Sequence, residues 1–236
     1  MTTSDLDGDL IRSLTLFKDV SEHHLATLVA AASLRQVRAR AVLFAEGDRV
    51  DNLYTLVRGS AELFSEHDDR RFTIGVVGAA RSLAVSSVLA QRHPLSARAI
   101  EPSELIAVPA KLVVELISRD PGLANAVVRE LANDSVQIIE DFKSHRLLTT
   151  TERIAHWMLH CDKKTGGSGQ IVIPFDKRIL ASYLGMAPEQ LSRSFSALAS
   201  AGVVVKGRSI TLTDRIALAE VAGGWSRLNG HSHGAA

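Results

Sequence analysis

The spacing of apolar residues changes along the chain, and each change predicts a different kind of structure. Through residues 1–31 apolar positions recur at helical intervals, with a break near Ser21. From residue 34 to residue 110 short apolar runs alternate with turn residues about every 8–12 positions. This second pattern predicts about six or seven short strands in a small sandwich or barrel. We expect a short helix at about 82–90 to interrupt them.

Helical spacing returns after residue 110 and is longest after Pro121, a residue favoured at the first position of a helix. Apolar positions then repeat in alternating steps of three and four residues, as in a two-stranded coiled coil. The strongest members of this seam are Val128, Leu131, Ile138 and Phe142. The seam predicts a dimerisation helix over 121–147, although a helix packed on its own domain needs only an apolar stripe.

The last third of the chain predicts two helices, a turn between them and a hairpin after them. Asp176 is placed to cap the first helix, and Gly185 marks the turn. Pro188 opens the second helix, which ends before Gly202. Short apolar runs over 203–212 surround a Lys-Gly turn, as in a β-hairpin. This order predicts a helix-turn-helix with a wing.

These patterns together predict an α+β protein with four segments. They are a sensor domain over 1–120, the dimerisation helix over 121–147, a winged helix-turn-helix domain over 148–218 and a flexible tail over 219–236.

Composition narrows the class of protein. The chain is 46% hydrophobic and 22% charged, as in ordinary globular proteins. It has no apolar run of about 18 residues and an acidic N-terminus, so we expect no membrane span, no secretory signal and a cytoplasmic location. The single cysteine, Cys161, excludes an intrachain disulfide and makes an iron–sulfur cluster held by four cysteines of one chain unexpected.

The net charge of +1 conceals an uneven distribution. Residues 1–142 carry 15 Lys and Arg against 20 Asp and Glu, whereas residues 143–215 carry 11 against 5. A basic C-terminal part predicts a polyanionic partner, of which double-stranded DNA is the one that suits a winged helix-turn-helix.

The second helix of this motif divides into two faces. A buried stripe at positions i, i+4 and i+7 begins at Leu191. The opposite face carries four polar residues: Glu189, Ser192, Arg193 and Ser196. Arg193 can bond O6 and N7 of guanine together, Glu189 can accept from N4 of cytosine, and Ser192 can adapt to either role. The alternative is that Glu189 and Arg193 form only a surface ion pair.

Contacts to DNA phosphates are expected from the first helix, the second helix and the wing. The candidates are Lys177, Ser196, Lys206 and Arg208. Such contacts position a protein on DNA without reading its sequence. In the alternative function, the chain is a ligand-binding module whose winged helix contacts another protein.

An enzyme is not expected. The sequence has no Walker-type phosphate loop and no recognisable nucleophile–base pair. His156 and His160 lie four residues apart on one predicted helix, but the His-Glu-x-x-His pattern of zinc enzymes is absent.

Three segments of the front domain carry a family resemblance: Leu43-Phe-Ala-Glu-Gly-Asp48, Leu53-Tyr54 and Arg58 to Phe64. With the long helix and the winged helix that follow, residues 10–217 resemble the Crp/Fnr family of bacterial transcription regulators. The resemblance implies an N-terminal β-roll of the cyclic-nucleotide-binding type, a long dimerisation helix and a C-terminal winged helix-turn-helix. It also implies a homodimer with DNA and RNA polymerase as partners.

The recognition helix resembles one branch of that family. Glu189-Gln-Leu-Ser192-Arg193 is similar to the Glu-x-x-Ser-Arg pattern of the FNR/FixK-like branch. This resemblance implies an inverted repeat of TTGAT-type half-sites. The catabolite-activator branch has an additional arginine where this chain has Pro188, which has no side-chain donor for a base.

Cyclic nucleotide binding is not expected, because the phosphate-binding segment of the family is altered. The glutamate of that segment is replaced by Ser82 or Leu83, and its arginine by Leu95. A buried cyclic phosphate without an arginine is poorly paired. Arg81 or Arg98 could replace it, although Arg98 would have to point inward on its strand.

An apolar effector pocket is the alternative that the resemblance offers, since some relatives bind haem there and respond to diatomic gases. The candidate pocket residues are Arg81, Ser82, Leu83, Val88, His93 and Leu95. His93 is the best candidate for an axial haem ligand. The other open alternative is that no effector is needed. Haem and the absence of an effector are both favoured over cyclic AMP.

Overall fold

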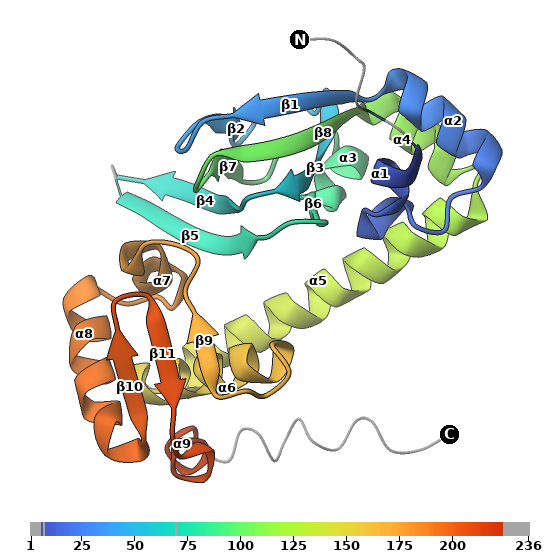
Figure 1. The fold of residues 1–236 in the computed structure, drawn as a ribbon. Helices are drawn as coiled ribbons and strands as arrows, with labels where there is room; N and C mark the ends of the chain where they lie inside the picture. Colours follow the sequence, from blue (N-terminus) through green and yellow to red (C-terminus); the bar gives the residue numbers. More distant parts are fainter. Residues whose placement is uncertain (1–5, 7, 69, 224–236) are drawn as a thin grey trace. The chain divides into compact units, whose positions relative to one another are not determined.

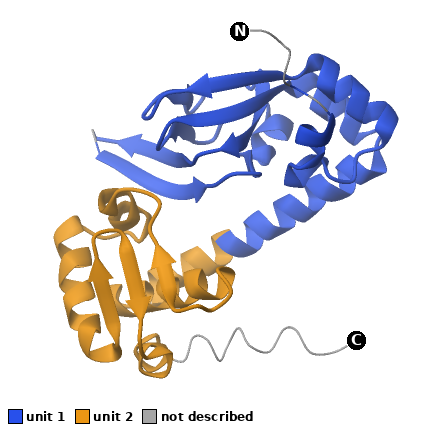
Figure 2. Cartoon of the chain, viewed as in Figure 1, with its two compact units in different colours: residues 1–137 blue, residues 138–236 orange. Residues whose placement is uncertain are grey.

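The computed structural model describes residues 6, 8–68 and 70–223, which form two compact units. Unit 1 covers residues 1–137 and unit 2 covers residues 138–236 (Figure 2). The boundary lies inside the longest helix, α5 (Pro121–Leu147), so each end of α5 belongs to a different unit.

The described residues of unit 1 contain eight strands in two four-stranded antiparallel sheets, ordered β1-β8-β3-β6 and β2-β7-β4-β5 (Figure 1). The strands are β1 (Ser33–Val37), β2 (Val42–Phe44), β3 (Asn52–Arg58), β4 (Ala61–His67), β5 (Arg70–Val77), β6 (Ser82–Leu83), β7 (Ser96–Ala99) and β8 (Ser103–Pro109). A small apolar core that includes Phe44, Leu56 and Ala97 joins the two sheets. The predicted sandwich of short strands is therefore confirmed.

A larger core lies on the other side of β3 and β8, where helices cover the sheet. The helices are α1 (Gly8–Arg12), η2 (Thr15–Phe17), α2 (Glu22–Ala31), α3 (Val85–Ala90), α4 (Ala110–Ile117) and the first part of α5. Leu53 and Ile106 point from the strands into this core, where Phe17 and Leu123 are fully buried. Side chains alternate along a strand, so one sheet faces both cores.

The start of the helix predicted at 82–90 is wrong. Ser82 and Leu83 form β6, which pairs with Thr55 and Tyr54 of β3. The helix begins only at Val85. A strand of two residues is defined by its partner, and the hydroxyls of Thr55 and Ser82 are hydrogen-bonded at 2.9 Å.

Asp120 fixes the start of α5 to the N-terminal helices. It is buried, and its carboxylate accepts hydrogen bonds from the backbone N–H groups of Ser21 and Leu123 and from the Ser21 hydroxyl. His24 Nδ1 lies 2.8 Å from the same carboxylate. These hydrogen bonds hold the pKa of Asp120 well below its usual range against the opposing effect of burial.

Unit 2 begins with the last part of α5 and has the predicted helix-turn-helix and wing. Its other elements are α6 (Thr150–Lys164), β9 (Gln170–Val172), α7 (Lys177–Tyr183), α8 (Pro188–Ala197), η3 (Leu198–Ala201), β10 (Val203–Lys206), β11 (Ser209–Leu212) and α9 (Arg215–Val221). The strands form one antiparallel sheet in the order β10-β11-β9. The predicted α+β class is confirmed.

The C-terminal boundary differs from the expected one. Helix α9 continues beyond residue 218 to Val221, because Leu218 is fully buried and Asp214 caps the first turn. Of the expected tail, residues 224–236 lie outside the described part of the chain. Among the described residues, no helix has the length and apolar character needed to cross a membrane.

Candidate nucleic-acid interface and sensor pocket

Three residues that the sequence singles out define the start of α7, the turn after it and the start of α8. The side chain of Asp176 accepts a hydrogen bond from the Arg178 N–H at 2.8 Å and caps α7. Gly185 adopts φ +63°, in the left-handed region that glycine enters without strain. Pro188 occupies the first turn of α8, as predicted.

Helix α8 separates an apolar face from a polar one. Its buried side contains Leu191 and Phe195, and Leu198 follows in η3 with 1% exposure. The four polar residues predicted on the other face are all exposed: Glu189, Ser192, Arg193 and Ser196. No ion pair joins Glu189 to Arg193, although both belong to the described part of the chain. Both charges are therefore available to a partner.

The predicted phosphate contacts lie on different elements of unit 2. Lys177 is half-buried, with its Nζ 5.5 Å from the centroid of the Phe195 ring. Lys206 and Arg208 are exposed on either side of Gly207 at the tip of the wing. The Ser196 hydroxyl donates to the Ser192 carbonyl at 3.2 Å. Two cations at the wing tip can approach a phosphate without any rearrangement of the fold.

The predicted effector residues are dispersed through unit 1. Leu83 lies in the core between the sheets, whereas Val88 lies in the core under the helices. Arg81 pairs with Asp134 of α5 at 3.4 Å, and Leu95 is half-buried. Ser82 is buried and bonded to Thr55. Of the six candidates, only His93 lines a described pocket.

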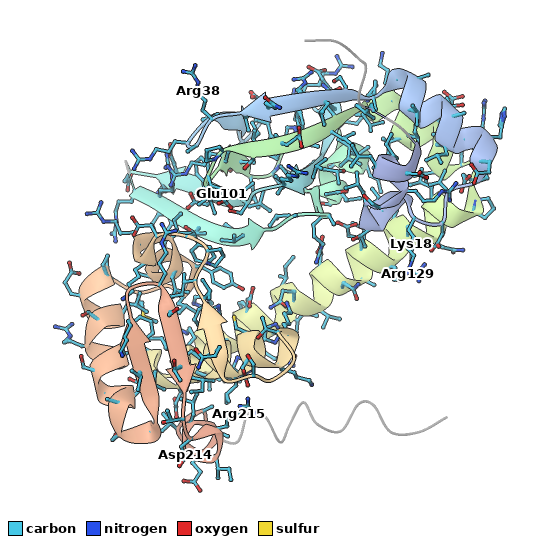
Figure 3. The ribbon with its side chains drawn as sticks, viewed as in Figure 1. Lys18, Arg38, Glu101, Arg129, Asp214 and Arg215 are labelled. Carbon is cyan, nitrogen blue, oxygen red and sulfur yellow. The ribbon has the colours of Figure 1, made fainter. Side chains whose placement is uncertain are left out.

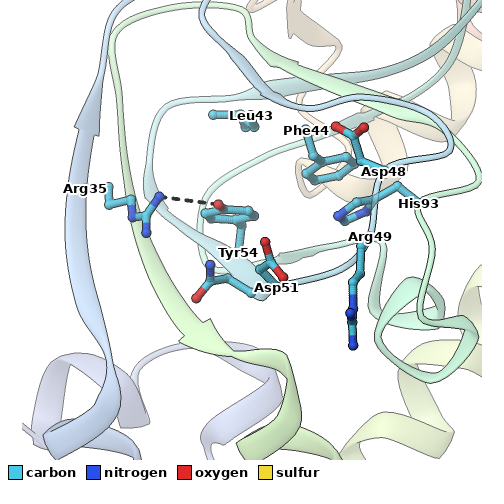
Figure 4. A pocket seen from close by; sticks show the side chains of 9 residues that line it. Arg35, Leu43, Phe44, Asp48, Arg49, Asp51, Tyr54 and His93 are labelled. Atoms are coloured by element: carbon cyan, nitrogen blue, oxygen red, sulfur yellow. Dashed lines mark hydrogen bonds between the residues drawn. The ribbon is translucent and has the colours of Figure 1, made fainter.

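The pocket at His93 has a volume of about 330 Å³ and a largely polar lining (Figure 4). Its residues are Arg35, Leu43, Phe44, Asp48, Arg49, Asp51, Asn52, Tyr54 and His93. The His93 ring is stacked on Phe44, with centroids 3.7 Å apart, and its buried Nδ1 has no hydrogen-bond partner among the described residues. Burial lowers the pKa of His93, against the raising effect of Asp48 and Asp51.

These residues do not fit haem. A porphyrin needs a mostly apolar cavity and a histidine that is free to face the iron. Here two aspartates and two arginines line the pocket, and Phe44 occupies one face of the His93 ring. His93 is therefore not assigned as a haem ligand.

Both arginines that could replace the family's phosphate-binding arginine have carboxylate partners. Arg98 Nε lies 2.5 Å from Glu62, which is 1% exposed and also accepts from the Thr73 hydroxyl at 2.6 Å. Arg81 is bound to Asp134. The Glu62–Arg98 pair was not anticipated from the sequence, where the two residues are far apart.

The remaining candidates for chemistry are in unit 2. Burial raises the pKa of the Cys161 thiol to about 11, which disfavours the reactive thiolate at neutral pH. No group of three or more potential metal ligands occurs among the described residues. His156 and His160 therefore have no third ligand there with which to hold a metal ion. Arg153 of α6 is buried, and its guanidinium donates to the backbone carbonyls of Ser144 and Leu184. These contacts could not be predicted from the sequence, where the one signal is a cation on the apolar side of a predicted helix.

Known proteins resemble both units. The cyclic nucleotide-binding domain model matches residues 34–120, and the Crp-like helix-turn-helix domain model matches residues 152–221. The chain is 26% identical over 200 residues to the transcriptional activator protein Anr of Pseudomonas protegens, covering 80% of each chain. It is 24% identical over 216 residues to the fumarate and nitrate reduction regulatory protein of Escherichia coli, covering 86% of this chain and 84% of the relative.

The structure of FixK2 from Bradyrhizobium japonicum has the same fold. It aligns with a TM-score of 0.73 at 22% identity, covering 80% of this chain and 96% of FixK2. The two domain matches, the curated relatives and this fold agree with the order of sheets, long helix and winged helix described above. The chain belongs to the Crp/Fnr family of DNA-binding transcription regulators.

Proposed function

We propose that the chain acts as a homodimer that reads an inverted repeat of TTGAT-type half-sites. The observation that carries this proposal is the exposed polar face of α8, formed by Glu189, Ser192, Arg193 and Ser196 over a buried apolar stripe. The first turns of a recognition helix are the part that reaches base edges in the major groove. In this arrangement Arg193 bonds guanine and Glu189 accepts from cytosine.

The exposed apolar residues of α5 support the dimer. Val128, Ile138 and Phe142 are 65%, 65% and 61% exposed, whereas Leu131 is half-buried against the core of unit 1. Exposed apolar side chains at coiled-coil spacing favour burial against a second copy of the same helix. The proposed partners are thus a second copy, double-stranded DNA and RNA polymerase.

We infer that DNA binding does not require a cyclic nucleotide. The two arginines considered as replacements, Arg81 and Arg98, are bound to Asp134 and to Glu62, respectively. A cyclic phosphate would have to displace a carboxylate from one of them, and the displaced Glu62 would be left buried without its partner. The protein is therefore proposed to bind its operator without added ligand.

Fluorescence anisotropy of the full chain tests the specificity. One duplex carries TTGAT and ATCAA about one helical turn apart, and another carries a TGTGA-type palindrome. Tighter, salt-dependent binding to the first duplex, unchanged by cyclic AMP, is the expected result. Preference for the second duplex contradicts the half-site assignment. Absence of salt-dependent binding to either duplex favours the alternative in which the winged helix contacts a protein.

Sedimentation of a Phe142→Asp variant tests the dimer. A charge placed in the seam would be buried without a partner, so the variant should sediment as a monomer. Lys143→Asp, one position away and outside the seam, is the control and should remain dimeric. A dimeric Phe142→Asp variant contradicts the assignment of the seam.

A further inference from the structure

Arg153 of α6 connects the end of α5 with the turn of the helix-turn-helix. Its side chain is buried, at 8% exposure. Nη1 donates to the Leu184 carbonyl at 2.6 Å, and Nη2 donates to the carbonyls of His145 and Leu148 at 3.3 and 3.2 Å. Nε donates to the Ser144 carbonyl at 3.4 Å. One guanidinium thus joins four backbone carbonyls from two helix ends.

The chemistry of the guanidinium suits this position. The last carbonyls of a helix have no partner within the helix, and a cation is favoured beside them. The donors of arginine lie in one rigid plane, so they can face several acceptors at once. Arg153 has no carboxylate partner among the described residues, so its interactions in this junction are the ones with these carbonyls.

Two further contacts join the same helix ends. A Cβ on Gly185 would lie 2.5 Å from His145 Cε1, so the turn approaches α5 as closely as a glycine allows. The Tyr183 hydroxyl donates to the Asp141 carboxylate at 3.3 Å. Leu184, the residue that Arg153 binds, lies between Tyr183 and Gly185. The turn that leads into α8 is therefore held against the last turns of α5 at three successive residues.

We propose that Arg153 is a positioning residue for DNA binding, which fixes the direction of the last turns of α5 relative to the recognition helix α8. The proposal rests on the homodimer and inverted repeat proposed above. Ile138 and Phe142 of the seam lie on the part of α5 that belongs to unit 2. The seam and α8 then belong to the same unit, so contacts within unit 2 set the distance between the two recognition helices of a dimer. Arg153 holds that distance at one value.

The test uses Arg153→Lys in the full chain. Lysine keeps the positive charge, but a single ammonium cannot face four carbonyls on two helices. The matched control is Asp214→Ala, which removes the cap of α9 in the same unit, a helix that carries none of the four carbonyls bound by Arg153. Asp214 Oδ1 accepts from the N–H groups of Ile216 and Ala217, and Figure 3 shows this residue at the start of α9.

Binding is measured on duplexes whose half-sites are moved apart or together by single base pairs, and on a duplex with one half-site. The wild type should prefer one spacing. Arg153→Lys should lower that preference by roughly tenfold, the effect of losing one charged hydrogen bond, while keeping its affinity for the single half-site. Asp214→Ala should keep the preference of the wild type.

Two outcomes with a DNA-binding wild type overturn the proposal. In one, Arg153→Lys retains the spacing preference. In the other, it loses affinity equally on the single half-site and on every spacing, which is the behaviour of a purely structural residue. A wild type that binds no duplex overturns the proposed function itself, so the two failures are distinguishable.

A second variant covers the case in which Arg153→Lys does not fold. Tyr183→Phe removes only the hydroxyl that binds Asp141 and leaves the apolar ring in place. It should weaken the spacing preference by a smaller factor and leave the single half-site affinity unchanged. An unaltered preference in a folded Tyr183→Phe variant, when Arg153→Lys cannot be measured, counts against the proposal.

Discussion

Helix α8 and the β-sheet unit differ in how their predicted functional residues are arranged. Glu189, Ser192 and Arg193 lie together on one exposed face of α8. The residues predicted for an effector pocket are instead dispersed. Leu83, for example, lies in the core between the sheets, whereas His93 lines a polar pocket. One helix fixes the directions of its own side chains, whereas a pocket between strands depends on which strands pair.

The same difference explains why Arg98 is a structural residue here. It lies directly opposite Glu62 in the pairing of β7 with β4, a register that no local pattern indicates. A buried carboxylate next to it then takes the arginine as an ion-pair partner. In unit 1 the chemistry of a residue follows from its cross-strand neighbour rather than from its own segment.

The largest effect is expected from breaking this pair. Arg98→Met should lower the free energy of unfolding by about 3–5 kcal/mol, because Glu62 would remain buried without its partner. Thermal and denaturant unfolding measure the change.

Cyclic AMP added to the wild type should give no stabilisation, since a ligand that binds the folded state would raise the melting temperature.

The double variant Glu62→Met with Arg98→Met is the control for that prediction. Replacing both partners by apolar residues removes the unpaired charge and should recover most of the lost stability. If the double variant is as unstable as Arg98→Met, the loss comes from packing around β4 and β7 and not from the unpaired carboxylate.

The next effect concerns Glu130 on the unit 1 part of α5. Burial raises its pKa from 4.5 to about 7, Arg81 lowers it and Asp134 raises it. The folded state therefore favours the protonated carboxyl. The contribution of Glu130 to the free energy of unfolding should be highest below pH 4.5 and fall by up to about 3 kcal/mol as the pH rises to about 7.

Denaturant unfolding across that pH range measures this dependence. Glu130→Gln keeps the shape of the side chain and removes its titration, so its stability should vary less with pH. Glu115→Gln, at a half-exposed residue of α4 paired with Arg119, is the control and should keep the slope of the wild type. An unchanged slope in Glu130→Gln would show that another group dominates.

Much of the architecture can be predicted from the sequence, and the reason is local. The cap at Asp176, the turn at Gly185 and the start of α8 at Pro188 each depend on one residue and its near neighbours. The start of α3 could not be predicted, because Ser82 and Leu83 are strand residues only through their pairing with β3.

The functional residues show the same limit. The exposed polar face of α8 follows from helical spacing, but the hydrogen bonds of Arg153 depend on carbonyls of Ser144 and Leu184 that only the folded chain brings to it. His93 is a related case, since its ring is stacked on Phe44 of a distant strand. The sequence shows that a titratable residue lies on an apolar face, but it does not show which group that residue contacts in the folded chain.

A smaller effect on DNA binding is expected from a change on the exposed polar face of α8. Arg193→Ala should weaken binding to the TTGAT-type duplex by about 1–3 kcal/mol and relax the preference at the guanine. Anisotropy on duplexes substituted at that base pair measures the preference. Arg178→Ala removes an exposed cation of α7 and is the control for charge. Equal losses on all duplexes for both variants would place Arg193 on a phosphate.

The smallest effect, Lys206→Ala, separates positioning from reading within unit 2. Lys206 is exposed at the wing tip, on a different element from Arg193 of α8. A phosphate contact contributes through counterion release, so its loss should weaken all sequences alike and lower the salt slope by about one. Titrations at several salt concentrations on matched and mismatched duplexes measure both quantities. A change in sequence preference would mean that the wing also reads bases. Base recognition would then be divided between the wing and the exposed polar face of α8.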